Sequence, residues 1–463
     1  MGAATKGFED YVSLIGAQLG HADRVEPFRG YCTGLLLPVQ RKSVEPMAAH
    51  LAPARVRSEH QRLHHFVADA AWDDAAVLAA VREHVQTQAL ARTGPAEALL
   101  IDDTGFPKQG RHSVGVARQY CGQLGKQDNC QVAVSISLAN EAFSLPVAYR
   151  LYLPQEWATD ALRRRQGKVP EQITFATKPA LALQLLQSLH ASSAALPNLV
   201  VADAGYGVNT SFRDSLSALG LRYVVGITGA VKVWPKGQAP LPPKPWSGRG
   251  PKPKLLRRDA EHQPLSAKAL ALHWPSRAYR TVTWRVGTNT VLSSRFAAVR
   301  VRCAHRDYWR AELPSEQWLL IEWPHGQTEP IKYFLSTLPA TTPLKELVRL
   351  AKLRWRIERD YQELKQELGL GHFEGRSWRG FHHHATLCIA AYAFLLTQRL
   401  TAPKKTLPHP ILSEVPALPE GFRPRGSPAA TAPRTGLDKD AAPGTRRRAD
   451  RTSRSVSMLR SKA

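Results

Sequence analysis

Apolar residues recur every three or four positions in Leu347–Leu368, a stretch that contains neither proline nor glycine. This spacing places them on one face of a helix, and the abundant leucine, arginine, lysine, glutamate and glutamine favour helical backbone. The sequence therefore predicts one amphipathic helix here, packed against a core by its apolar face. That face consists of Leu350, Leu353, Ile357, Tyr361, Leu364 and Leu368.

A second face of the same helix carries Arg354, Glu358 and Lys365, because four and eleven residues are both close to whole helical turns. A carboxylate between two cations, beside a buried face, is suited to chemistry on a phosphate ester. The same pattern also occurs on solvated helix faces that carry ion pairs. The helix by itself leaves both interpretations open.

Two apolar runs elsewhere predict short buried strands that end in carboxylates. The run 98–101 leads into Asp102 and Asp103, and the run 199–202 leads into Asp203, with a glycine shortly after each. Acidic residues at such strand ends are typical of sites on α/β sheets. With a glutamate on a helix, they could supply the hard oxygen ligands that divalent cations require. Two such cations can activate a nucleophile and stabilise the leaving oxygen in phosphodiester chemistry.

Taken in order, these motifs resemble those of bacterial insertion-sequence transposases of the DDE, RNase H-like superfamily. The helix matches the Tyr-x2-Arg-x3-Glu-x6-Lys signature of one branch from Arg354 through Glu358 to Lys365. Ala351 occupies the tyrosine position, so the role of that tyrosine is lost or supplied elsewhere. The resemblance covers roughly residues 95–400. It extends to Asp103-Thr104, to the Asp-x-Gly-Tyr sequence 203–206 and to the sequence 369–384.

The resemblance implies an α/β fold, with an RNase H-like catalytic core at 95–400 and a mainly β subdomain inserted at about 208–339. It implies that Asp103, Asp203 and Glu358 are catalytic and bind two Mg²⁺ ions, with Mn²⁺ as a possible substitute. Arg354 and Lys365 would hold DNA phosphates near that site. The implied activity is cut-and-paste transposition: metal-dependent cleavage at transposon ends, then strand transfer into target DNA. The implied assembly is a homodimer that bridges two ends.

The first metal ligand has two candidates. Neighbouring residues of a strand face opposite sides, so only one of Asp102 and Asp103 should reach the site. We choose Asp103 because Thr104 follows it directly, as in the Asp-Thr of the family. Asp102 remains the alternative.

Two other functions are compatible with the same motifs. One is a transposase-derived repressor that binds DNA without catalysis, although the presence of all three acidic residues argues against it. The other is a related nuclease that lacks strand transfer. Cleavage of end-bearing DNA separates the first alternative from a transposase, and a 3′-hydroxyl joining assay separates the second.

Residues 1–92 have a helical pattern and predict either a DNA-binding module or a helical subdomain packed on the core without DNA contact. Its candidate phosphate contacts are Arg41, Lys42, Arg55, Arg57 and Arg62. Further along, the pattern predicts a buried helix at Phe381–Leu400. Extended segments are predicted at Ala98–Asp103, Gly115–Leu124, Asn129–Leu138, Phe143–Leu153, Val224–Val233, Arg280–Val286, Phe296–Cys303, Gln317–Glu322 and Ile331–Ser336.

Three further segments carry specific expectations. Seven prolines exclude a helix at 235–253, where basic residues and Trp234 and Trp246 fit either a loop that tracks DNA or a plain linker. The three histidines 382–384 point in different directions on a helix, so they cannot share one metal, and we expect a capping or DNA-proximal role. The basic, proline-rich segment 401–463 predicts a disordered tail.

The charge points to a polyanionic partner. The chain has 63 basic and 38 acidic residues, a net charge of +25, which is typical of nucleic-acid binding. An arginine-rich proteome would be the alternative cause. Five scattered cysteines without a C-x-x-C pair indicate a reducing cytoplasm rather than a disulfide framework. No signal peptide is expected, because the N-terminus carries Glu9 and Asp10 and has no basic-then-apolar run. No membrane association is expected, because the longest apolar run, Ala385–Leu396, is too short to span a bilayer.

We predict that DNA binding weakens steeply with salt, because lysine and arginine contacts to phosphates release counterions. The measurement is the slope of log K against log salt concentration in a gel-shift series. A slope near zero would contradict the inference drawn from the net charge.

Overall fold

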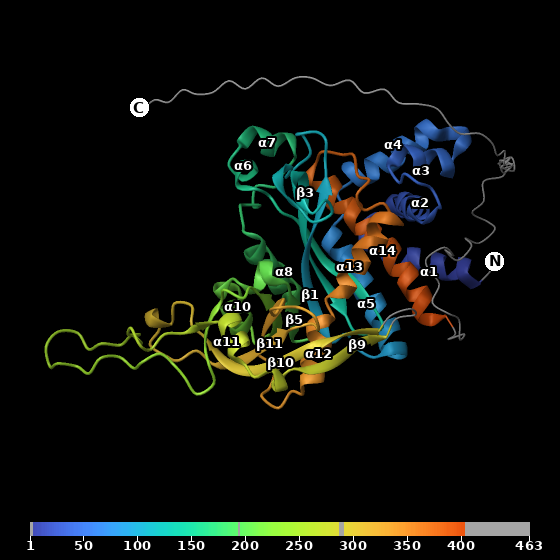
Figure 1. Ribbon diagram of the computed structural model, residues 1–463. Helices are drawn as coiled ribbons and strands as arrows, with labels where there is room; N and C mark the ends of the chain where they lie inside the picture. The colour runs from blue at the N-terminus through green and yellow to red at the C-terminus, as the bar shows by residue number, and fades with distance from the viewer. Residues whose placement is uncertain (1–2, 193–194, 287–290, 403–463) are drawn as a thin grey trace, which may run out of the picture. The chain divides into compact units, whose positions relative to one another are not determined.

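The computed structural model describes residues 3–192, 195–286 and 291–402, and a twelve-stranded sheet runs through them (Figure 1). The first half of the sheet is built on β3, which pairs antiparallel with β1, β2 and β4. β1, β5 and β6 then lie side by side in parallel. These strands are β1 (Ala98–Pro107), β2 (Ala117–Cys121), β3 (Lys126–Ala139), β4 (Ser144–Leu151), β5 (Leu199–Ala202) and β6 (Arg222–Ile227).

The strands of the predicted insertion continue this sheet. β12 pairs antiparallel with β6, and the order then runs through β11, β10, β7 and β8, with β9 paired to β10. The open edge of β6 is thereby covered, which satisfies its backbone groups. The strands are β7 (Lys232–Trp234), β8 (Leu265–Ser266), β9 (Arg280–Val286), β10 (Val291–Cys303), β11 (Glu316–Glu322) and β12 (Lys332–Ser336).

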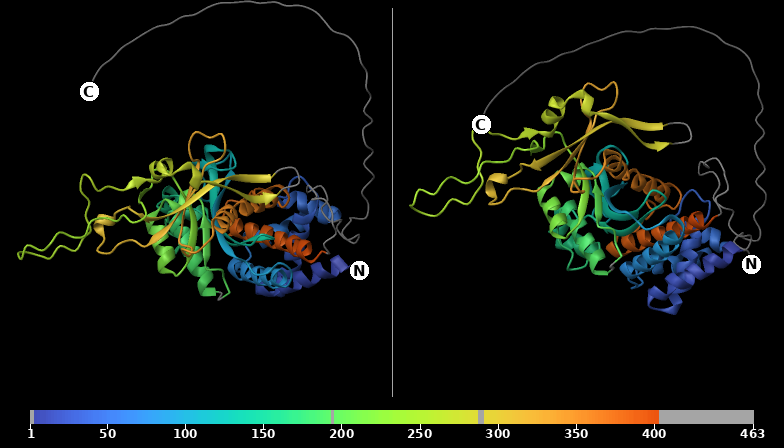
Figure 2. Two further views of the ribbon diagram at one scale, coloured as in Figure 1. Left: turned by 60° about the horizontal axis from the view of Figure 1, so that its bottom comes forward. Right: turned by 90° about the horizontal axis from the view of Figure 1, so that it is seen from below.

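The predicted extended segments correspond to these strands, with three corrections. β1 continues to Pro107 instead of ending at Asp103, and β10 begins at Val291 instead of Phe296. Val224–Val233, expected as one strand, forms the end of β6 and the start of β7, and residues 228–231 turn between them. The segment 235–253 is not helical and belongs to the long connection between β7 and β8, which projects from the sheet (Figure 2). Trp246 is exposed there, but Trp234 is fully buried and donates its Nε1–H to Asp307 Oδ2 at 2.6 Å.

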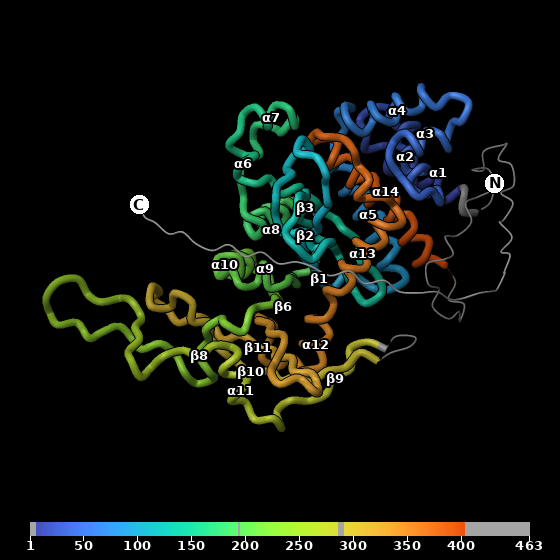
Figure 3. Tube along the Cα trace, turned by 45° about the horizontal axis from the view of Figure 1, so that its top comes forward, coloured from blue at the N-terminus to red at the C-terminus, as the bar shows by residue number. Residues whose placement is uncertain are grey.

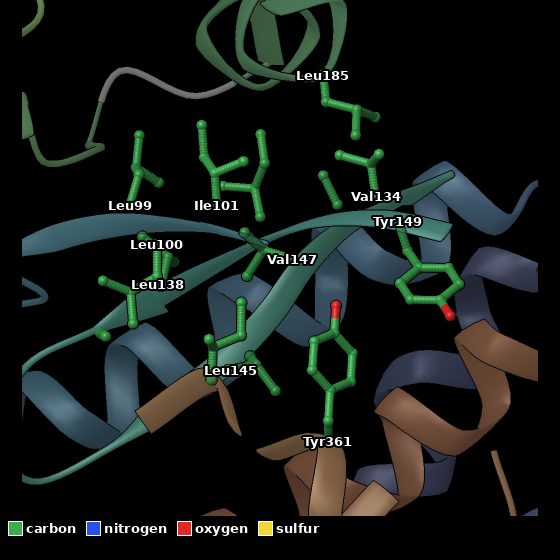
Figure 4. Close-up of a cluster of buried hydrophobic side chains, with 14 of the residues drawn as sticks. Leu99, Leu100, Ile101, Val134, Leu138, Leu145, Val147, Tyr149, Leu185 and Tyr361 are labelled. Atoms are coloured by element: carbon green, nitrogen blue, oxygen red, sulfur yellow. The ribbon is translucent and has the colours of Figure 1, made fainter. Parts of the chain in front are cut away.

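Helices cover both faces of the first half of the sheet. In Figure 4, Leu185 of α8 lies on the same side as Leu99 and Ile101 of β1, whereas Tyr361 of α13 lies on the opposite side. The helices that follow β4 are α6 (Gln155–Ala158), α7 (Ala161–Gln166), α8 (Lys178–Ser192), α9 (Ala204–Gly207), α10 (Thr210–Ala218), α11 (Ala267–His273), α12 (Leu344–Lys352), α13 (Trp355–Gln366) and α14 (Trp378–Thr401).

The predicted helix at 347–368 is divided into α12 and α13. Around Leu353 and Arg354 the backbone bonds from i to i−3: Leu353 N donates to Leu350 O, and Ile357 N donates to Arg354 O, each at 3.1 Å. This tighter turn breaks the α-helical ladder without a proline or glycine. The prediction of one continuous helix is therefore wrong, but all six residues of the predicted apolar face are buried.

α14 is the buried helix expected from the sequence, and the N-terminal helices pack around it (Figure 3). α2, α4 and α5 contact α14 directly, and Tyr11 of α1 donates its hydroxyl to the Ala390 carbonyl at 2.7 Å. The predicted helical region 1–92 thus shares a core with the rest of the chain. Its helices are α1 (Ala3–Gly16), α2 (Val25–Leu36), α3 (Val44–Leu51), α4 (Val56–Ala68) and α5 (Asp74–Thr93).

Burial changes the interpretation of several polar residues. Lys42, expected to contact phosphate, is buried and donates its ammonium to the carbonyls of Leu35 and Leu37. The histidines 382–384 are also buried, with ring nitrogens bonded to backbone groups or to Tyr31. A DNA-proximal role for these histidines is therefore wrong, because all three lie inside the packing around α14.

Three remaining expectations concern the membrane, the cysteines and the tail. None of the helices in the described part of the chain is both long and apolar enough to cross a membrane. All five cysteines are buried free thiols. Within the predicted tail 401–463, Thr401 belongs to α14, and positions 403–463 lie outside the described residues.

Asp360 of α13 links this helix to β4 and α14 through a buried carboxyl group. Its Oδ1 accepts a hydrogen bond from Tyr392 at 2.9 Å, and its Oδ2 accepts one from Ser144. Burial raises the pKa of Asp360 to about 7, against the lowering effect of these two hydrogen bonds. The folded chain therefore retains a proton that the unfolded chain releases near the ordinary carboxyl pKa.

We predict that Asp360→Asn removes part of the pH dependence of stability. A raised carboxyl pKa stabilises the fold at low pH, and this contribution is lost as pH rises towards about 7. Between pH 5 and pH 8 the melting temperature of the wild type should fall relative to that of Asp360→Asn by roughly 5 °C. An equal change in melting temperature for the wild type and Asp360→Asn between pH 5 and pH 8 would contradict the raised pKa.

Candidate active site

Asp102 and Asp103, the two half-buried residues in the middle of β1, make contacts on different sides of the strand. Asp102 Oδ2 accepts a hydrogen bond from Arg354 Nη1 at 2.6 Å, and its Oδ1 accepts the backbone N–H of Asp103 at 2.9 Å. Asp103 Oδ2 instead accepts from Lys178 Nζ at 2.9 Å. As expected from strand geometry, one carboxylate faces α13 and the other faces the start of α8.

Asp203 follows β5 directly and caps α9. Its Oδ1 accepts the backbone N–H of Gly205 at 2.9 Å. β5 pairs in parallel with β1, and Ala202 is the register partner of Ile101. Asp203 therefore leaves β5 beside Asp102 of β1. The prediction that a strand ends at the carboxylates holds for Asp203 but is wrong for Asp102 and Asp103, because β1 continues to Pro107 through its pairing with β3.

Glu358 lies in the first turn of α13, with 61% of its side chain exposed. Its Oε1 accepts from Arg354 Nη2 at 2.8 Å. Arg354 thus bridges Glu358 and Asp102 with two nitrogens of one guanidinium group. The predicted pairing of Arg354 with Glu358 on one helix face is confirmed, and the bridge to β1 adds a contact that the helix pattern does not contain.

Lys365 lies about two turns after Glu358 on α13. It contacts the far end of β1. Its ammonium donates to Gly105 O at 2.7 Å and to Gln123 Oε1 at 3.1 Å, and lies 4.9 Å from the centre of the Phe106 ring. Burial lowers the pKa of Lys365 to about 8. Lys365 therefore lies against β1, away from the Arg354–Glu358 pair.

The carboxylates at the strand ends repel each other. Burial raises the pKa of Asp102 to about 7; Arg354 acts in the opposite direction, and the negative charges of Asp203 and Asp103 raise the pKa further. An uncompensated cluster of this kind favours bound protons or cations. Two basic side chains, Arg354 and Lys178, supply positive charge at this edge of the sheet.

Tyr206, in the Asp-x-Gly-Tyr sequence, brings a buried hydroxyl to the same group. Only 2% of Tyr206 is exposed, and no described protein atom makes a hydrogen bond with its hydroxyl. The negative charges of Asp103, Asp102 and Asp203 add to burial in raising the pKa of Tyr206 well above its ordinary value. Its hydroxyl is therefore a donor near the carboxylates without a protein acceptor among the described residues.

Two glycines allow close packing beneath these motifs. A Cβ on Gly207 would lie 1.9 Å from the carbonyl oxygen of Gly226, because α9 packs directly on β6. A Cβ on Gly105 would lie 2.8 Å from Cys121 Sγ and 3.2 Å from its Cα. The glycines after Asp103 and Asp203 thus serve packing of the backbone that holds the carboxylates.

Sequence reasoning selected Asp103, Asp203, Glu358, Arg354 and Lys365 but missed Lys178 and Tyr206. The structure brings Arg354, Glu358 and Asp102 into direct contact and pairs Asp103 with Lys178. In the described part of the chain, no three His, Cys, Asp or Glu side chains converge closely enough to form a metal site. Lys178 gives a weak sequence signal, a lysine at the start of a helix; Tyr206 was included only as part of a motif.

Comparison with known families identifies the class of protein. The family model described as DDE superfamily endonuclease matches residues 15–291, more than half of the chain. The chain therefore belongs to the DDE superfamily endonucleases. The matched region includes α2–α5 together with Asp103 and Asp203, and ends before Glu358.

The resemblance to bacterial insertion-sequence DDE transposases is confirmed by this family match together with one similar protein. The chain is similar to the probable transposase for insertion sequence element IS701 of Microchaete diplosiphon, with 32% identity over 203 residues. The aligned region makes up 44% of this chain and 48% of that protein. It therefore spans about half the length of the relative.

We predict that Gly207→Ala destabilises the fold, because the new Cβ would collide with the Gly226 carbonyl oxygen, a backbone atom. The expected loss is about 1–3 kcal/mol, as for other overpacked sites. Chemical denaturation measures it. Gly110→Ala is the matched control, since a Cβ on Gly110 has no heavy atom within 4 Å. Equal stability of the two variants would contradict the close packing of α9 on β6.

Proposed function

We propose that this protein is a transposase that cleaves DNA at the ends of an insertion sequence and joins the freed 3′-hydroxyl to target DNA. The observation that carries the proposal is the placement of the three motif carboxylates. Asp103 lies within β1 and Asp203 directly follows the adjacent parallel strand β5, and Arg354 bonds both Glu358 and Asp102, the neighbour of Asp103 in β1. Membership of the DDE endonucleases supports DNA as the substrate.

Asp103, Asp203 and Glu358 are the proposed ligands of two Mg²⁺ ions, or of Mn²⁺ in their place. The chemistry of the donors fits, because all three are carboxylates, the hard oxygen ligands that these cations prefer. The mutual repulsion of Asp102, Asp103 and Asp203 and the unpartnered hydroxyl of Tyr206 also fit a site for a cation and its water or phosphate ligands. Bound cations would activate the attacking hydroxyl or water and stabilise the leaving oxygen.

The contacts of Asp102 favour Asp103 as the first ligand. Asp102 commits one oxygen to Arg354 and the other to the backbone N–H of Asp103. Asp103 has one lysine partner and 28% of its side chain exposed. We propose that Asp102 holds the Arg354 guanidinium in place, while Asp103 binds the cation.

Arg354 and Lys365 are the proposed contacts to DNA phosphates near the cleaved bond. Arg354 reaches both Asp102 and Glu358, so a phosphate bound there would lie beside the proposed ligands.

The exposed Trp246 and the basic residues of 235–253 extend the basic surface along the projecting loop. The first half of the sheet begins with four antiparallel strands, β1 to β4, followed by helices and by β5 and β6 in parallel with β1, which supports an RNase H-like core. A homodimer acting on two ends in the cytoplasm completes the proposal.

We predict that Asp103→Ala, Asp203→Ala and Glu358→Ala each abolish cleavage while DNA binding persists. Mutating a residue that only hydrogen-bonds to a metal ligand typically lowers metal affinity or activity about ten- to hundredfold. Loss of a ligand itself should therefore slow cleavage by more than about 100-fold. Removing negative charge beside phosphate should not weaken binding. The measurements are cleavage of a duplex carrying the end of the element, with Mg²⁺ or Mn²⁺, and a gel shift on the same DNA.

Glu367→Ala is the matched control, because Glu367 is the C-cap residue of α13, at the opposite end of the helix from Glu358. It should cleave at the wild-type rate. Normal cleavage by Glu358→Ala would remove this glutamate from the site. An inactive Asp102→Asn together with an active Asp103→Asn would reverse the assignment of the first ligand. Cleavage without 3′-hydroxyl joining would identify a nuclease rather than a transposase.

A further inference from the structure

Lys178 makes a contact to the proposed site that the family signature does not include. It is the first residue of α8, and its ammonium lies 2.9 Å from Asp103 Oδ2. The two side chains are 29% and 28% exposed, so the pair is partly shielded from water. Lys178 thus approaches β1 from the face opposite the Arg354–Asp102 pair.

The stability of α8 does not account for a lysine at this position. The N-terminus of a helix carries partial positive charge, so a cation there is unfavourable by about as much as a partly exposed ion pair contributes. α8 has no acidic residue in its first turn to offset the lysine. The unfavourable charge at the helix N-terminus and the favourable ion pair therefore approximately cancel. Helix stability gives no reason for a lysine here, and its contact with Asp103 is what distinguishes Lys178.

The start of α8 is fixed by other groups. Thr177 accepts the Leu181 N–H through its carbonyl oxygen at 2.8 Å, and Leu181, Ala182 and Leu185 are buried against the sheet. These contacts hold the helix on the face of β1 that carries Leu99 and Ile101 (Figure 4). The Lys178 side chain is therefore delivered to Asp103 by packing that does not itself need the ion pair.

We propose that Lys178 is a positioning residue for DNA cleavage. Its ammonium orients the Asp103 carboxylate and, when that carboxylate binds a divalent cation, contacts a phosphate of the bound DNA. The inference rests on the proposed function, in which Asp103 is a metal ligand. The two basic residues differ in this proposal. Arg354 bonds to two carboxylates, whereas Lys178 bonds to one, Asp103, and can exchange that contact for a DNA phosphate.

The proposal gives Lys178 two opposite effects. A lysine ammonium repels a cation that approaches its partner carboxylate, so its removal should tighten metal binding. The same removal should eliminate one phosphate contact and slow cleavage. A lysine that served only to stabilise the fold would produce neither tighter metal binding nor a smaller salt dependence.

The experiment uses the full chain with Lys178→Met and Lys178→Arg. Mn²⁺ binding without DNA is measured by electron paramagnetic resonance. DNA binding is measured by gel shift in the presence of Mn²⁺ at several salt concentrations, and cleavage is measured at saturating Mn²⁺. Lys178→Met should bind Mn²⁺ about threefold or more tightly than wild type. It should reduce the salt slope by about 0.9, the value of one phosphate contact, and cleave at least about tenfold more slowly. Lys178→Arg should restore most of the cleavage rate and the salt slope.

Lys268→Met is the matched control. Lys268 also lies in the first turn of a helix, α11, and pairs with a carboxylate, Glu329, at 2.5 Å. It should leave Mn²⁺ binding, salt slope and cleavage unchanged. Weaker or unchanged Mn²⁺ binding by Lys178→Met, or an unchanged salt slope, would overturn the role of Lys178. If the wild type itself fails to cleave, the proposed function fails, and Mn²⁺ binding and salt slope still decide whether Lys178 acts on Asp103 and DNA.

Discussion

The repulsion among carboxylates at one edge of the sheet is the constraint around which the site is built. Asp102 and Asp103 lie within β1, Asp203 follows the adjacent strand β5, and burial makes the negative charge of Asp102 costly. Arg354 and Lys178 offset part of that cost from opposite faces of β1. Removing either partner would leave a carboxylate with less compensation, so the two helices and the strand depend on one another.

The break between α12 and α13 lies at Arg354, the residue that joins Glu358 of α13 to Asp102 of β1. The i to i−3 bonds around Leu353 and Arg354 tighten the backbone immediately before Glu358. Leu353 and Ile357 remain buried on either side of the break, so the core contact survives the change in helical pitch. The apolar face thus fixes the position of α13, and the ion pairs fix which residues meet β1.

The N-terminal helices and α14 form the other half of the core, and their packing explains why Lys42 and the histidines 382–384 are buried. Lys42 and the histidines 382–384 are bonded to backbone groups or to Tyr31 inside this packing. The family match begins at residue 15 and includes α2–α5 together with the first two carboxylates. The helical region and the sheet therefore form one structural unit within the described residues.

The sequence determined the local elements well. Apolar residues spaced by three and four identified the buried face of α12 and α13. Short apolar runs identified β5, β9 and β11 nearly to the residue and the start of β1, because burial imposes those patterns directly. The motif order identified Asp103, Asp203 and Glu358 as candidates. The spacing also anticipated the contact between Arg354 and Glu358, since four residues make about one turn.

Only the tertiary structure decided the relations between elements. The insertion strands extend the central sheet because β12 covers the edge of β6, a long-range pairing without a local signal. The contacts of Arg354 with Asp102 and of Lys178 with Asp103 join residues far apart in the chain. The helix break and the burial of Lys42 and of the histidines likewise follow from packing partners. A linear pattern records which residues are apolar or charged, whereas the choice of partner depends on how distant segments meet.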